Sequence, residues 1–213
     1  MRIQLLLTAA VALALAGCGG SSDFANEVNP AAAEGNAAIG PADAPDGTIP
    51  TPGAAQTARN GQEYVALAGA SDLYEIEAAR LAIEKATHDE VRTLAQAILA
   101  DHQRSTTQLS AAAREADPVL TMPSEMNAQQ QADVDALRAA SGAAFGTLFL
   151  DQQVRAHEQA LTLVTAYASE GDVEALRRHA STVAGPIQAH LSQARALVEQ
   201  AAQPEPGASA SNQ

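Results

Sequence analysis

A helical apolar period, sustained over long stretches, dominates this sequence. It is clearest in residues 91–113, VRTLAQAILADHQRSTTQLSAAA, where Val, Leu, Ile and Ala recur every three or four positions. At about 100° per residue these side chains form one stripe along a helix, and His102 falls near the centre of that stripe. An imidazole in a place that suits leucine is costly to bury alone, so His102 is expected to have polar partners.

The composition favours helices over strands. Hydrophobic residues make up 46% of the 213-residue chain, but aromatic residues only 3%, so alanine and leucine supply most of the apolar mass. This composition predicts an all-α protein. The formal net charge of −13 makes nucleic acid an unsuitable partner, because phosphate backbones repel such a chain. The single cysteine excludes an intramolecular disulfide and a cysteine-based metal cluster.

That cysteine follows an apolar amino-terminal segment. Residues 1–17 begin with a positive charge at Arg2 and continue as an apolar run too short to span a bilayer. They end in Leu-Ala-Gly before Cys18, which looks like a bacterial lipobox. The resemblance implies cleavage before Cys18 and its lipidation, and Gly19 in place of Asp favours the outer membrane. We therefore expect a periplasm-facing lipoprotein of the cell envelope, the alternative being an ordinary secretory signal with a chance cysteine.

Four parts of the chain are predicted from these patterns. Residues 1–17 form a lipoprotein signal peptide, and residues 18–61, rich in Gly, Ala and Pro, form a lipid-anchored flexible linker. Residues 62–202 form the folded domain, and residues 203–213 form a disordered tail.

The folded domain is predicted to be a four-helix bundle. Apolar periods and helix-stop signals indicate long helices over residues 62–86, 88–116, 143–169 and 172–201, with a short helix over residues 128–139. Four amphipathic helices of similar length bury their stripes best against one another. Four polar residues, one on each long helix, point inward on a helical wheel and are expected to meet near the midplane: Glu75, His102, His157 and His190.

Several short stretches resemble a bacterial family of exported, ferritin-like proteins of unknown function, often labelled predicted outer membrane protein. The matching stretches are ASDLYEIE (70–77), ADH (100–102), SGAAF (141–145), VRAHE (154–158) and GPIQAHL (185–191). The family usually has Phe-Asp where this chain has Phe145-Gly146, so any role of that Asp does not transfer. The resemblance implies a ferritin-like bundle over residues 63–200 and implies no activity.

Two interpretations of the polar centre follow. The Glu-x-x-His pairs of di-iron bundles are absent, so a standard ferroxidase centre is not expected. One carboxylate and up to three imidazoles could instead hold a single Zn, Mn, Fe or Cu ion, or a small ligand, with Asp101 and Glu158 orienting ring nitrogens.

The other interpretation is a metal-free hydrogen-bonded cluster inside a non-enzymatic envelope protein. In both interpretations we expect a binding or structural protein rather than an enzyme, because the sequence shows no nucleophile–base pair and no phosphate loop. His88 and His179, near helix ends, are expected to face solvent or cap their helices. The sequence contains no motif that indicates a protein partner or an oligomeric state.

Overall fold

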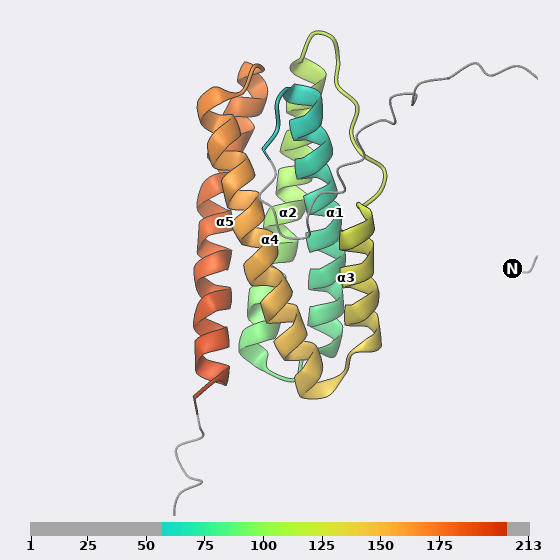
Figure 1. Ribbon diagram of the computed structural model, residues 1–213, viewed down its shortest axis with the longest axis vertical. Coiled ribbons are helices and arrows are strands. Elements are labelled where there is room, and N and C mark those ends of the chain that lie inside the picture. The colour runs from blue at the N-terminus through green and yellow to red at the C-terminus, as the bar shows by residue number, and fades with distance from the viewer. Residues whose placement is uncertain (1–56, 204–213) are drawn as a thin grey trace, which may run out of the picture. The chain divides into compact units, whose positions relative to one another are not determined.

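The computed structural model describes residues 57–203, which are helical throughout apart from short connections (Figure 1). The helices are α1 (Gly61–Lys85), α2 (Asp89–Glu115), α3 (Ala128–Ala139), α4 (Gly142–Glu170) and α5 (Glu174–Ala201). No strand occurs among the described residues, so the all-α prediction is confirmed there, and each predicted helix end lies within two residues of the observed one. The predicted signal peptide, nearly all of the linker and nearly all of the tail lie outside the described residues.

Local signals in the sequence explain where two of the helices begin. The Asn60 side chain caps α1 by accepting a hydrogen bond from the backbone N–H of Glu63 at 3.0 Å. Asn127 and Gln130 form a reciprocal capping box at the start of α3. Each cap satisfies amide groups that the first turn of a helix leaves without partners.

The four long helices pack in a ring. α1 lies against α2 and α4, and α5 also lies against α2 and α4, so every long helix has two long neighbours. Figure 1 shows α1 and α5 descending while α2 and α4 ascend. The chain therefore needs a long return between α2 and α4, and residues 116–141 supply it with α3, which packs against α1 and α4. The sequence left this crossover topology open.

The buried core is divided into two apolar clusters along the helices. One cluster includes Ile98 and Phe149, and the other includes Leu109 and Leu163. On α2 and α4 the polar positions His102 and His157 fall between these members of the two clusters. A polar layer therefore separates two apolar layers. Among residues 57–203, no helix has the length and apolar character that crossing a lipid bilayer requires.

Candidate metal centre

Each long helix contributes one of the four predicted polar residues to this layer. The exposed fractions are 1% for Glu75 on α1, 6% for His102 on α2, 1% for His157 on α4 and 4% for His190 on α5. The prediction that these side chains are buried is confirmed. Each lies on the apolar stripe of its helix, so helix packing carries it inward together with its apolar neighbours.

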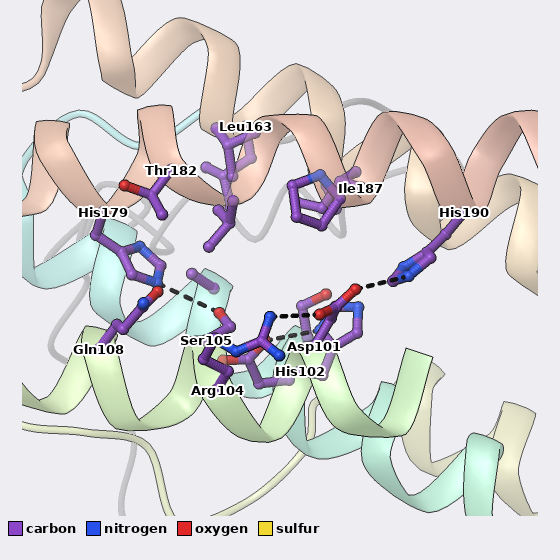
Figure 2. Close-up of a pocket in the computed structure, with 17 residues that line it drawn as sticks. Asp101, His102, Arg104, Ser105, Gln108, Leu163, His179, Thr182, Ile187 and His190 are labelled. Atoms are coloured by element: carbon purple, nitrogen blue, oxygen red, sulfur yellow. Dashed lines mark hydrogen bonds and ion pairs between the residues drawn. The ribbon is translucent and has the colours of Figure 1, made fainter. Parts of the chain in front are cut away.

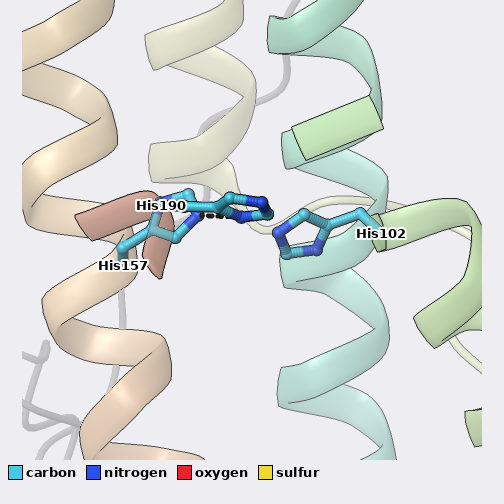
Figure 3. A group of neighbouring side chains, drawn as sticks. All are labelled: His102, His157 and His190. Carbon is cyan, nitrogen blue, oxygen red and sulfur yellow. Dashed lines mark hydrogen bonds between the residues drawn. The ribbon is translucent and has the colours of Figure 1, made fainter. Parts of the chain in front are cut away.

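Three of the four residues form a close histidine cluster, which we define as His102, His157 and His190. One ring nitrogen of each lies within 4.8 Å of the others, and Figure 3 shows the three rings facing one another from separate helices. His157 Nε2 and His190 Nδ1 lie 3.3 Å apart. Glu75 stands beside this cluster rather than within it, with Oε1 3.6 Å from Nδ1 of His157.

The remaining nitrogen of each ring meets an oxygen acceptor. His102 Nδ1 lies 2.8 Å from Asp72 Oδ1, and His190 Nε2 lies 3.1 Å from Asp101 Oδ2. His157 Nδ1 lies 3.0 Å from the backbone carbonyl oxygen of Gln153. A carboxylate or a carbonyl only accepts, so each of these nitrogens carries the hydrogen. In the neutral rings the lone pairs then belong to His102 Nε2, His157 Nε2 and His190 Nδ1.

Burial and nearby charge set the protonation of the centre. Burial raises the pKa of Glu75 to about 7, although His102 opposes that shift. Burial also disfavours charge on His102, but the hydrogen bond to Asp72 and the charge of Glu75 outweigh it and raise the pKa of His102. The pKa of His157 is lowered well below its usual value, first by burial and then by His102 and His190.

The pKa of His190 is lowered, as is that of His157. Burial and the neighbouring His102 lower the pKa of His190, although Asp101 opposes this. At neutral pH the centre therefore holds two neutral imidazoles, one imidazole that gains a proton more readily than usual, and a carboxyl group that keeps its proton more readily than usual.

Two buried side chains in this layer have polar atoms without partners. Glu75 Oε2 and both amide atoms of Gln153 make no hydrogen bond of normal geometry, although Gln153 lies close enough to Glu75 to oppose its pKa shift. Gln153 is fully buried one helical turn before His157. Unpaired buried polar atoms are costly, so this part of the layer suits a further polar occupant.

The two residues predicted to orient the rings are placed differently. Asp101 contacts His190 and also accepts a hydrogen bond from Arg104 at 2.7 Å. Glu158 is exposed and pairs with Arg195 on the neighbouring helix. Asp72 holds His102 and was not among the residues predicted for this centre. Its spacing of three residues before Glu75, on the same side of α1, was the available signal.

The expectation that His179 faces solvent is wrong. His179 is 5% exposed, with Nδ1 2.8 Å from the Tyr64 hydroxyl and Nε2 3.3 Å from Ser105 Oγ. Tyr64 stacks on Tyr167 with ring centroids 4.1 Å apart, so α1 and α4 together cover this end of α5. A wheel for α5 alone cannot reveal a cover supplied by other helices.

A pocket of about 70 Å³ adjoins the histidine cluster between α2 and α5 (Figure 2). His102, His190, Asp72 and Asp101 are among its lining residues, whereas His157 and Glu75 are not. Arg104 and Thr182 are exposed and line it as well. The cluster therefore has an approach from solvent on one side.

Comparisons with known proteins agree on a helical fold. Two solved structures, "CopM in the Cu(I)-bound form" and "CopM in the Cu(II)-bound form", resemble this one with a TM-score of 0.58 each. Their sequences are 18% and 17% identical to this chain, and each match covers 68% of this chain and 99% of CopM. No curated protein sequence matches the chain. Residues 47–197 match a family pattern, and the chain belongs to that family, described as Domain of unknown function (DUF4142).

Proposed function

We propose that this protein binds a single copper ion between His102, His157 and His190. The observation that carries the proposal is the orientation of the three rings. The outward nitrogens of His102 and His157 form hydrogen bonds with oxygen acceptors, and that of His190 lies 3.1 Å from Asp101 Oδ2, so the inward lone pairs converge. Metal-binding histidines are held in this way, with one nitrogen fixed by an acceptor and the other free for the ion.

The spacing of the nitrogens supports the same proposal. His157 Nε2 and His190 Nδ1 lie 3.3 Å apart, and in the neutral rings neither has a hydrogen to give the other. Two nitrogens on one tetrahedral ion also lie about 3.3 Å apart when metal–nitrogen bonds are about 2.0–2.1 Å long. A cation between them would replace lone-pair repulsion by two bonds. The buried carboxyl group of Glu75 would supply a counter-charge close by.

Copper is the metal that the donor set and the fold favour together. Imidazole suits Zn, Cu, Fe and Ni, and among divalent first-row ions copper binds such sites most tightly. The likeness to CopM, which is described in copper-bound forms, supports this choice over Zn, Mn and Fe. The likeness concerns the fold, so the residues of this chain carry the argument for the site.

We also propose the setting in which the site works. The ring of four long helices supports a ferritin-like four-helix bundle over residues 62–202. Residues 18–61 would tether that bundle to the outer membrane through lipidated Cys18, on its periplasmic side. The bundle would bind metal without catalysis, because the groups around the proposed ion are three imidazoles and the carboxyl group of Glu75.

One observation favours a metal-free alternative. The hydrogen bond to Asp72 helps to raise the pKa of His102, and a protonated His102 could donate toward the other rings instead of binding an ion. In that case the centre would fix the register of the helices as a hydrogen-bonded cluster. The two functions differ in whether a stoichiometric ion is present.

The deciding experiment measures copper in the full chain purified without a histidine tag. After equilibration with Cu²⁺ and removal of free metal, we expect one copper per chain by elemental analysis. His102→Ala and His157→Asn should abolish it, while His88→Ala, which removes an exposed histidine, should keep it. Absence of copper from the wild type, or its retention in both cluster variants, would refute the proposal. Circular dichroism checks that each variant remains helical.

A further inference from the structure

The pocket beside the histidine cluster has the size and position of a passage. His102 and His190 lie among its lining residues, and its exposed residues include Arg104 and Thr182 (Figure 2). A water molecule needs roughly 10–15 Å³ of such space, so about 70 Å³ holds several waters or a partly hydrated ion. Another pocket, lined by residues such as Asp89 and Gln200, touches none of the three histidines.

Negative charge outweighs positive charge along the pocket. With His102 neutral, as metal binding requires, Asp72 and Asp101 outweigh Arg104, which is the one Lys or Arg side chain among the lining residues. Burial lowers the pKa of His179, the remaining basic side chain outside the cluster, which keeps that imidazole neutral at pH 7. A cleft with excess carboxylate concentrates cations and speeds their association.

Asp101 is partly exposed to solvent and also contacts the histidine cluster. Its side chain is 27% exposed, and its two oxygens meet different partners. Oδ1 accepts from Arg104 at 2.7 Å, and Oδ2 lies 3.1 Å from His190 Nε2. A carboxylate in this position can meet a hydrated cation before the imidazoles do.

The wall of the pocket opposite Asp101 offers few atoms that could bind a cation. It consists largely of apolar side chains of α4 and α5, including Leu163, Val183 and Ile187. Pro186 lies on the same wall and has no N–H, so the carbonyl of Thr182 lacks its usual helical partner. Apart from the backbone oxygen of Thr182, the atoms that bind a cation strongly are the carboxylate oxygens of Asp72 and Asp101 and the ring nitrogens of the histidines.

We propose that this pocket is the route by which a hydrated copper ion reaches the histidine cluster, with Asp101 as the first carboxylate that it meets. The inference rests on the proposed function and adds a direction of access to it. Glu75 and His157, each 1% exposed, do not line the route.

The test narrows the pocket without changing any residue of the cluster. Thr182→Phe places a bulky side chain at an exposed lining position. Ser181→Phe is the matched control, because Ser181 is exposed, adjacent and absent from the lining, and its hydroxyl likewise donates to the carbonyl four residues before it. Mixing each protein with aqueous Cu²⁺ in a weakly coordinating buffer gives association rates from the quenching of tyrosine emission, since the chain contains three Tyr and no Trp.

Thr182→Phe should slow association and dissociation several-fold and equally, because a narrower route raises the barrier in both directions and leaves Kd unchanged. Ser181→Phe should keep the wild-type rates. Equal rates in the two variants, with copper still bound, would overturn the route and leave the proposed function standing. Failure of the wild type to bind copper would instead refute the proposed function, and the route with it.

A second pair of variants tests the charge along the pocket. Arg104→Gln removes the Arg side chain of the pocket, while Arg114→Gln removes an exposed charge from the same helix outside the lining. Arg104→Gln should speed association several-fold at low ionic strength, and the gain should shrink in added salt. The same acceleration in Arg114→Gln would mean that net charge, rather than this pocket, directs the ion, and would count against the route.

Discussion

Asp72 and His102 join α1 to α2 inside the polar layer. Asp72 Oδ1 lies 2.8 Å from His102 Nδ1, and Asp72 Oδ2 accepts a hydrogen bond from Thr106 Oγ1 at 3.1 Å. Thr106 lies one turn after His102 on α2, so the carboxylate bridges two positions on one face of that helix. The bridge fixes the ring of His102 with Nε2 as the free nitrogen.

Asp72→Asn is expected to weaken copper binding while keeping the fold. The amide oxygen of Asn can still accept from His102, but it lacks the charge that makes the ring a stronger ligand. Losses of such partners typically reduce metal affinity by about 10- to 100-fold. A competition titration against a chelator of known affinity measures the change. Asp151→Asn, at an exposed position on α4, is the control, and an equal loss there would show that Asp72 has no special role.

The helices could be predicted from the sequence because their apolar periods are long. The same periods identified Glu75 and His102, since each is a polar residue on an apolar stripe. The role of Asp72 could not be predicted in this way, because it depends on His102, which lies on another helix. The burial of His179 depends on Tyr64 and Tyr167 in the same way. Periodicity states which side of a helix faces inward, but it does not state what the neighbouring helices bring there.

Tyr64→Phe tests whether His179 has a structural role distinct from the metal site. The change leaves His179 Nδ1 buried without its 2.8 Å partner, which should cost about 1–3 kcal/mol in the free energy of unfolding. Copper stoichiometry should not change. Tyr167→Phe removes a hydroxyl that donates to the exposed Asp172 and should cost less, because water can replace that partner. Chemical denaturation of both variants measures the difference, and equal costs would contradict the assignment.

Glu75→Gln should reveal the penalty of ionising a buried carboxyl group. Burial raises the pKa of Glu75 from 4.5 to about 7, so its charged form is disfavoured in the folded protein. The metal-free wild type should therefore lose stability relative to Glu75→Gln as pH rises from about 4.5 to about 7. This shift corresponds to about 3 kcal/mol, and the difference should stay constant above pH 7.

Denaturant titrations in the presence of a chelator, at several pH values, measure this difference. The charge of Glu75 helps to raise the pKa of His102, so His102 titrates at a lower pH in Glu75→Gln and contributes to the pH dependence of the difference. A difference that does not change between pH 4.5 and 7 would mean that Glu75 titrates normally.

Cys18→Ser tests the predicted lipid anchor, which lies outside the described residues. Serine cannot be acylated through sulfur, so the variant should leave the membrane fraction after a salt wash, whereas the wild type should remain there. Several acyl chains bind a membrane firmly, at about 0.8 kcal/mol per buried CH₂. Retention of the variant in membranes would contradict the lipobox interpretation.

Copper should stabilise the folded protein in a way that separates the two interpretations of its centre. An ion that binds only the folded state adds about 2.7 kcal/mol to the free energy of unfolding at a hundredfold excess over Kd. Added Cu²⁺ should therefore raise the melting temperature of the wild type, and a chelator should reverse the rise. His88→Ala should behave like the wild type, because His88 is exposed and distant from the layer.

The stabilisation should also depend on pH, because copper needs neutral imidazoles. The raised pKa of His102 means that protons compete with the metal at a higher pH than they would for an ordinary histidine. The gain from copper should therefore be full well above that pKa and should shrink as pH falls through it. A hydrogen-bonded cluster without metal predicts a melting temperature that neither copper nor chelator changes at any pH, and that result would decide in its favour.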